Sequence, residues 1–170
     1  QVAPPLAQPP EECKVPEHER TTIMLRNLPN DYTRSMLLEL LDAEGYQSSY
    51  DFVYLPQDFK RKAGLGYAFV NLVTHDLAER ARQHFEGFSA WKFSSQKVCE
   101  AAWGAPLQGL EQHVERYKNS PLMHGDVPDE FKPALFKDGA RMPFPAATKR
   151  LRPPRVKLQR GADDAVGAET

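Results

Sequence analysis

The chain has 170 residues, of which 41% are hydrophobic and 26% charged, and its mean hydropathy is −0.59. Such a composition supports one core that uses only part of the chain, and the longest stretch without Lys, Arg, Asp or Glu, residues 63–75, is too short to cross a bilayer, which needs about 20 apolar residues. The formal net charge is −1, so any basic surface must be local.

The N-terminus has neither a basic nor an apolar segment, so we expect no signal peptide. It also lacks an initiator Met, which leads us to expect that the chain is part of a longer protein. Cys13 and Cys99 make no disulfide framework and favour a reduced, intracellular protein, nuclear or cytoplasmic.

Proline and charge indicate where the folded part lies. Five of the 15 prolines fall in the first 16 residues and seven in the last fifty, and proline interrupts regular structure. We therefore predict a disordered acidic segment at 1–19, a folded unit at 20–123 and a largely disordered, basic tail at 124–170. Within that tail, residues 132–160 carry nine Lys and Arg against one acid, Asp138.

The elements expected along the folded unit alternate in a βαββαβ order. Strands are predicted at 22–28, 50–55, 66–73 and 97–103, and helices at 33–45 and 74–87, each helix starting at a threonine that can cap it and ending at a glycine. Residues 57–64 read as a polar loop. The order predicts an α+β fold, with a four-stranded antiparallel sheet and both helices on one face.

One face of such a sheet is covered by helices and the other is open to water. In residues 66–72, Ala68 and Val70 form the natural core set, which leaves Tyr67 and Phe69 side by side on the open face. The same alternation turns Met24, Arg26 and Glu100 outward in their strands. Two aromatic rings beside a cation form a surface on which nucleic-acid bases can stack. The strand pattern alone is equally compatible with Tyr67 and Phe69 as ordinary core residues.

Two segments resemble the signature motifs of the RNA recognition motif. Residues 23–28 (IMLRNL) resemble its hexamer, and residues 65–72 (LGYAFVNL) resemble its octamer. Leu65 departs from the basic first position of the octamer, and Met24 from the usual aromatic of the hexamer. The wider pattern over 20–123, including Gln108–Gly109 and residues 119–123, resembles the C-terminal RNA recognition motif of the Mei-two-like meiosis regulators, in which a Met at that position is usual.

This resemblance implies a module that binds single-stranded RNA in meiotic or developmental regulation. The alternative is a protein–protein interaction module of the same fold that binds a peptide on its sheet or its added helix. The residues alone leave the facing of Tyr54 undecided, and the resemblance places it on the open face. The cations of the 57–64 loop are either solvated or a phosphate clamp, and Glu100 either solvated or an acceptor for a base amino group. The candidate RNA-binding residues are Tyr67, Phe69, Met24, Arg26, Tyr54, Asn71, Lys60, Arg61, Lys62 and Glu100.

After the last strand, Leu107, Leu110, Val114 and Tyr117 recur at helical spacing and predict a further helix that docks on the domain. We expect it to brace the core from the side rather than cover the aromatic face, and it is also a candidate surface for a protein partner. The basic tract at 149–157 resembles a nuclear localisation or nucleic-acid-binding segment.

The sequence offers no support for catalysis or a cofactor. The five histidines are scattered, none pairs with cysteine at metal-ligand spacing, and no phosphate-binding loop or nucleophile motif is present. We therefore expect a non-enzymatic monomer without a metal, a cofactor or a membrane partner.

Overall fold

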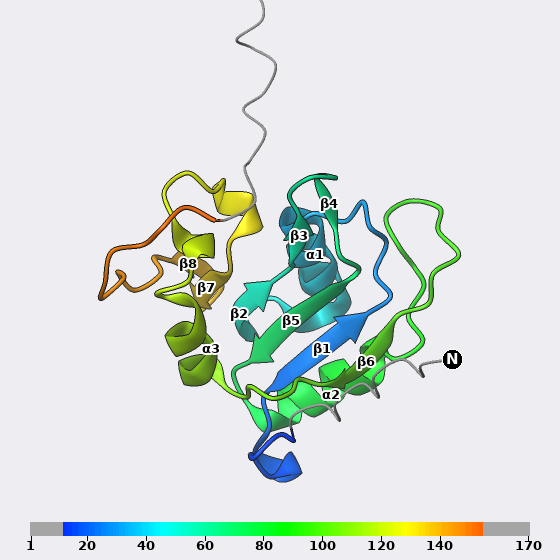
Figure 1. Ribbon diagram of the computed structural model, residues 1–170. Coiled ribbons are helices and arrows are strands. Elements are labelled where there is room, and N and C mark those ends of the chain that lie inside the picture. Colours follow the sequence, from blue (N-terminus) through cyan, green and yellow to red (C-terminus); the bar gives the residue numbers. More distant parts are fainter. Residues whose placement is uncertain (1–11, 155–170) are drawn as a thin grey trace, which may run out of the picture.

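The computed structural model describes residues 12–154, and its centre is one antiparallel sheet with the strand order β6-β1-β5-β2-β7-β8 (Figure 1). Its strands are β1 (Thr22–Arg26), β2 (Tyr50–Tyr54), β5 (Tyr67–Leu72), β6 (Glu100–Trp103), β7 (Ala134–Lys137) and β8 (Ala140–Met142). The helices α1 (Arg34–Leu41) and α2 (His75–Phe85) lie together on the far side of the sheet in this view. The predicted α+β fold of the first four strands and two helices is confirmed.

The register of β1 against β5 separates the two faces of the sheet. Ile23 pairs with Val70 and Leu25 with Ala68, and all four side chains are fully buried in the core beneath α1 and α2. The side chains of the alternate pairs, Met24 with Phe69 and Arg26 with Tyr67, lie on the other face of the sheet. A period of two along each strand is sufficient to give this segregation.

Both predicted helix starts are capped as expected. The hydroxyl of Thr33 accepts a hydrogen bond from the Met36 amide, and that of Thr74 accepts one from the Leu77 amide. After α1 the chain makes one wide turn, η2 (Asp42–Tyr46), in which Gly45 has a φ of 96°. That left-handed conformation explains why a glycine stands where the helix ends.

Three further segments differ from the expected outline. The loop at 57–64 contains a small hairpin, β3 (Gln57–Asp58) with β4 (Ala63–Gly64), and β6 begins three residues later than predicted. Between residues 12 and 20 a single turn, η1 (Glu17–Glu19), is present. The predicted disorder at 1–11 and 155–170 lies outside the described residues.

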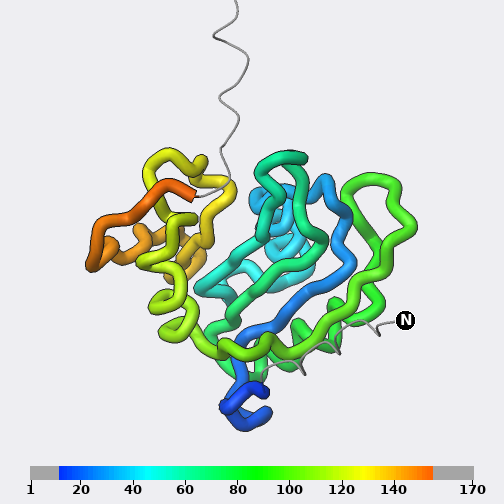
Figure 2. Tube along the Cα trace, in the orientation of Figure 1, coloured from blue at the N-terminus to red at the C-terminus, as the bar shows by residue number. Residues whose placement is uncertain are grey.

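The tail predicted to be largely disordered instead extends the sheet. After the short turns η3 (Pro121–Met123) and η4 (Asp129–Phe131), β7 pairs with β2 and then with β8 (Figure 2). Asp138 and Gly139, with φ of 51° and 82°, form the two-residue turn of this hairpin. Proline density was misleading here, because the prolines of this region lie at the start of η3 or outside the elements, and none lies within β7 or β8.

A buried arginine on α1 fastens this extension to the domain. The Arg34 guanidinium donates to the backbone oxygens of Asp129 and Lys132, at 2.5 and 2.7 Å, and to the Asp129 carboxylate at 2.6 Å. The Arg141 and Arg34 guanidinium groups together lower the pKa of Asp129 to about 2. The predicted boundary at residue 123 therefore cuts through one folded unit.

Candidate nucleic-acid interface

The open face of the sheet carries a stacking platform made of Met24 and Arg26 on β1 and Tyr67 and Phe69 on β5. Met24 lies opposite Phe69, and Arg26 lies opposite Tyr67. The two rings meet edge to face, with centroids 5.8 Å apart, and each side chain is half-buried while its strand neighbours are fully buried. The predicted strand facing is confirmed, and it presents two ring faces, a thioether and an exposed cation on one surface.

Glu100 stands beside the stacking platform on β6, where its backbone pairs with Arg26. Both side chains are exposed, so a carboxylate and a guanidinium flank the aromatic pair. At this edge of the platform, the guanidinium can donate hydrogen bonds to a base and the carboxylate can accept them.

The helix α3 (Leu110–Tyr117) occupies the β2 side of the same face. Phe52 is fully buried, with its ring centroid 4.8 Å from that of His113 and 6.0 Å from that of Tyr117. Tyr54 meets Tyr117 edge to face at 5.0 Å. Burial raises the pKa of Tyr54 far above its usual range, and the nearby Tyr117 and Tyr67 raise it further. Tyr54 thus faces the open side, as the resemblance implied, but under α3.

The expected docking of this helix is corrected in two respects. It lies on the aromatic face instead of bracing the core from the side, and it reaches Phe69, whose ring centroid is 6.2 Å from that of His113. The buried residue of α3 is His113, whereas Leu110 of the predicted stripe is 37% exposed. A hydropathy pattern misses this register because it counts an imidazole as polar, although its ring packs as an aromatic.

His113 is held in one tautomer. Its Nδ1 lies 2.8 Å from the backbone oxygen of Gly109, which can only accept, so Nδ1 carries a proton. Burial lowers the pKa of His113, and the hydrogen bond to Gly109 opposes this only in part. In the neutral ring Nε2 is therefore a free acceptor, and no hydrogen bond joins it to any residue of the described range.

Asn71 does not reach the open surface, unlike Tyr67 and Phe69 on the same strand. Its Oδ1 accepts hydrogen bonds from the hydroxyls of Thr21 and Thr22, both at 2.8 Å, and its Nδ2 donates to Asp51 at 2.7 Å. Only 2% of Asn71 is exposed. Its amide ties three segments together and is not available to a ligand.

Gln108 is buried between β1 and the segment that leads to α3, and its side chain joins the two by hydrogen bonds. In the sequence, Gln108 stands out only through the resemblance. Its Oε1 accepts from the backbone amides of Thr21 and Thr22, and its Nε2 donates to the backbone oxygens of Thr22 and Gly104. All four bonds measure 2.8–2.9 Å. Gln108 thereby fixes the path by which the chain crosses to the open face.

The cations Lys60, Arg61 and Lys62 lie at the tip of the β3–β4 hairpin, beyond one end of the sheet (Figure 1). All three are exposed, and Arg61 is 3.8 Å from the Asp58 carboxylate. The structure places these three cations outside the stacking platform. They could still contact a nucleic-acid strand that extends beyond the platform at this end of the sheet.

Within residues 12–154, no cluster of three or more His, Cys, Asp or Glu side chains is placed to hold a metal ion. No helix in this range combines the length and the apolar character that a membrane crossing requires. Both cysteines are free thiols, and burial raises the pKa of Cys99 to about 12.

Comparison with known proteins gives consistent matches. Residues 20–118 match the family model described as RNA recognition motif 2. The chain is 38% identical over 153 residues to "Protein MEI2-like 4" of Oryza sativa subsp. japonica and 41% identical over 129 residues to "Protein MEI2-like 3" of Arabidopsis thaliana, covering 86% and 76% of this chain. It spans only 15% and 16% of the length of those relatives.

Two solved structures also match part of this chain. The structure titled "Structure of RNA15 RRM" matches with a TM-score of 0.43 and 16% identity, over 51% of this chain and 91% of that one. A Sex-lethal protein/RNA complex matches with a TM-score of 0.43 and 25% identity, over 54% of this chain and 50% of that one.

Proposed function

The chain belongs to the RNA recognition motif 2 family, in the form found in MEI2-like proteins, and on that premise we propose that its stacking platform binds single-stranded RNA. The observation that carries the proposal is the pairing of Tyr67 and Phe69 with Met24 and Arg26 on a face that the helices α1 and α2 leave uncovered. We further propose that this RNA-binding module serves the regulation of meiosis or development inside the cell.

Stacking explains why these residue types suit RNA. Every base has a π face, and each base stacked on an aromatic side chain contributes about 1–3 kcal/mol as judged by alanine substitution. Two neighbouring rings accommodate about two bases, and the thioether of Met24 offers a soft apolar contact beside them. At the margin, the exposed Arg26 can donate to base edges or phosphates, and the exposed Glu100 can accept from a base amino group.

Binding, not catalysis, is the activity that the site supports. RNA recognition motifs act as binding modules, and the stacking platform holds no nucleophile paired with a base. The alternative of a peptide-binding module loses its main support, because His113 and Tyr117 of α3 pack inward on Phe52 and Tyr54.

Replacing one ring of the stacking platform tests the proposal. Tyr67→Ala is expected to weaken binding of a randomised single-stranded RNA pool by about 5- to 150-fold, the range that about 1–3 kcal/mol represents. Tyr67→Phe keeps the ring and is expected to bind within about twofold of the wild type. Fluorescence anisotropy at one fixed salt concentration measures both.

Thermal unfolding provides the control for this pair. Because Tyr67 is only half-buried, both variants should melt close to the wild type. Equal RNA affinity of Tyr67→Ala and the wild type, with both folded, would reject the stacking platform as the binding surface.

A further inference from the structure

A hollow of about 330 Å³ lies where the stacking platform meets α3. Phe69 forms one wall, the connecting segment Ala105–Leu107 a second, and His113, Arg116 and Tyr117 of α3 the third. The hollow thus joins a ring of the sheet to a helix outside the βαββαβ core.

The walls of this hollow suit a flat aromatic group. Phe69 and Tyr117 present rings, and Pro106 and Leu107 present apolar side chains. The volume is at the lower end of the range typical of small-molecule pockets, about 300–1,000 Å³, which fits one nucleotide and not a folded segment. Stacking and apolar contact together would hold a base here.

Polar groups are few and complementary to a nucleotide. The guanidinium of Arg116 is exposed and forms no ion pair with any residue between 12 and 154. Arginine binds phosphate through two parallel N–H donors. His113 adds an acceptor nitrogen, because its Nδ1 is already committed to Gly109.

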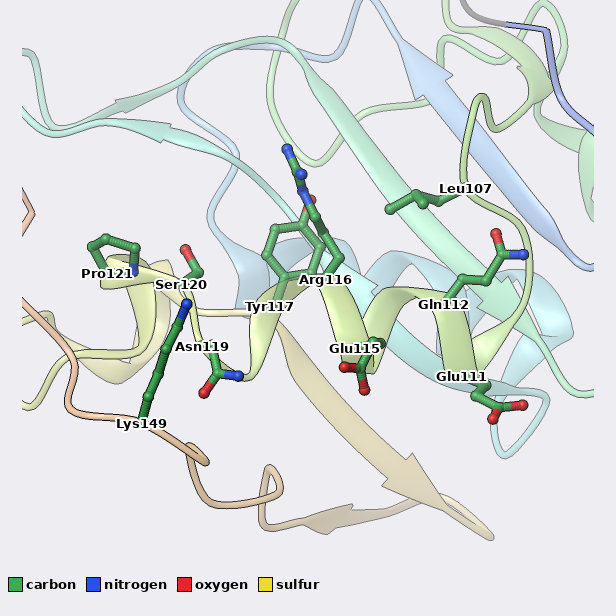
Figure 3. Close-up of a pocket in the computed structure, with 10 residues that line it drawn as sticks. All are labelled: Leu107, Glu111, Gln112, Glu115, Arg116, Tyr117, Asn119, Ser120, Pro121 and Lys149. Carbon is green, nitrogen blue, oxygen red and sulfur yellow. The ribbon is translucent and has the colours of Figure 1, made fainter.

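A second hollow beside α3 differs from this one in the charges that line it. The larger hollow, of about 1160 Å³, lies along α3 and is lined by Glu111 and Glu115 as well as by Arg116 and Lys149 (Figure 3). In that view Arg116 extends from α3 on the side opposite to the two glutamates. The two carboxylates of the larger hollow balance its two cations, whereas the smaller hollow has Arg116 and no acid among its lining residues, so the smaller one attracts a phosphate more strongly.

We propose that the hollow between Phe69 and α3 is a nucleotide-binding pocket, in which the base of one RNA residue stacks against Phe69 and Arg116 binds its phosphate. The proposal rests on RNA binding by the stacking platform and extends it: the nucleotide that stacks on Phe69 gains a second wall and a phosphate contact from α3. In this arrangement α3 does not simply cover half of the sheet: it provides a wall that the four strands alone lack.

The first test neutralises the cation. Arg116→Gln in the full chain is expected to weaken binding of a randomised single-stranded RNA pool about 3- to 10-fold, and to reduce the slope of log K against log salt by about 0.7, the contribution of one phosphate contact. Arg80→Gln makes the same chemical change at an exposed position on α2, away from the open face, and should alter neither quantity.

The second test fills the hollow without changing charge. Ala105 is exposed and lines the hollow, so Ala105→Phe places a ring in it without disturbing the core. It should also weaken binding several-fold. Combined with Arg116→Gln, the loss should be smaller than the product of the two single losses, because both act on one bound nucleotide.

The outcomes separate this proposal from the one on which it rests. If Tyr67→Ala weakens binding as expected while Arg116→Gln and Ala105→Phe match the wild type in affinity and salt slope, the pocket is rejected and the stacking platform stands. If the wild type binds no RNA from the pool, both proposals fail. Fully multiplicative losses in the double variant would show two independent contacts and would also reject a single shared nucleotide.

Discussion

Single residues decide how this open face is shared between α3 and a ligand. Strand alternation places Tyr67 and Phe69 on the same face of β5, but it leaves open whether that face is the core, and the motif resemblance was needed to predict the open side. The facing of Phe52 and Tyr54 does not follow from alternation either, because both sides of β2 are apolar in sequence. Asn71 has the correct facing and still fails as a contact residue, since its amide is consumed by threonines and Asp51. Such hydrogen-bond partners are distant in sequence and leave no local pattern.

The buried imidazole of His113 makes stability depend on pH. Because the folded pKa lies below the unfolded value of about 6.5, the unfolded chain takes up a proton first as the pH falls. The free energy of unfolding is therefore highest above about pH 6.5 and decreases below it. His113→Gln should show a shallower decrease between pH 7 and 5, measured by urea unfolding of the full chain.

His18 provides the matched control, because its side chain is 79% exposed. His18→Gln should keep the wild-type pH dependence. If His113→Gln and the wild type lose the same free energy of unfolding over this interval, the imidazole is not the group whose protonation destabilises the fold.

At the scale of elements, the sequence is sufficient to predict the βαββαβ unit and insufficient to place the helix and hairpin that come after it. Capping threonines, helix-ending glycines and strand alternation each act over a few residues, so a sequence reveals them. The Asp138–Gly139 turn is such a local signal as well. The prediction of disorder at 124–170 was based on proline density and did not use this turn. The placement of α3 depends instead on ring contacts between His113, Tyr117 and Phe52, which join segments about 60 residues apart.

The crossing from β6 to α3 should depend on Gln108. Gln108→Ala removes four hydrogen bonds, three of them buried, and leaves the backbone amides of Thr21 and Thr22 without this acceptor; an unpaired buried group costs about 1–3 kcal/mol. We expect a loss of at least about 2 kcal/mol in the free energy of unfolding, measured by urea titration. Gln83→Ala, at an exposed amide on α2, should cost less than about 0.5 kcal/mol. Similar stability of the two variants would show that the Gln108 bonds contribute little.

Over the whole molecule, a net charge near zero conceals a basic C-terminal segment that returns to the domain. The Asn119 and Thr148 side chains are joined by a hydrogen bond of 2.9 Å, and the Asn119 amide oxygen accepts another from the Thr148 backbone. These bonds bring the beginning of the basic tract to the end of α3. The rest of that tract, residues 155–157, lies outside the described range.

Neutralising the described part of this tract tests whether it contacts RNA. Lys149, Arg150 and Arg152 are exposed, so their joint replacement by Gln should leave the fold intact. If the tract contacts RNA, binding weakens and the salt slope falls by up to about 0.7 for each lost contact, with base preference unchanged. RNA titrations at several salt concentrations measure this. An unchanged slope would contradict a phosphate-binding role and leave cellular targeting as the use of the tract.

The pairing of β7 with β2 has a consequence for where this domain can be cut. In a four-stranded sheet β2 would be an outer strand, whereas here its backbone is paired on both sides. A chain shortened to the βαββαβ unit and α3 would leave that row of amides and carbonyls open, next to the apolar Tyr50 and Val53. Such an unprotected edge invites self-association through strand pairing. We therefore expect a chain that ends after Met142, and keeps β7 on the edge of β2, to self-associate less than a chain that ends after Tyr117.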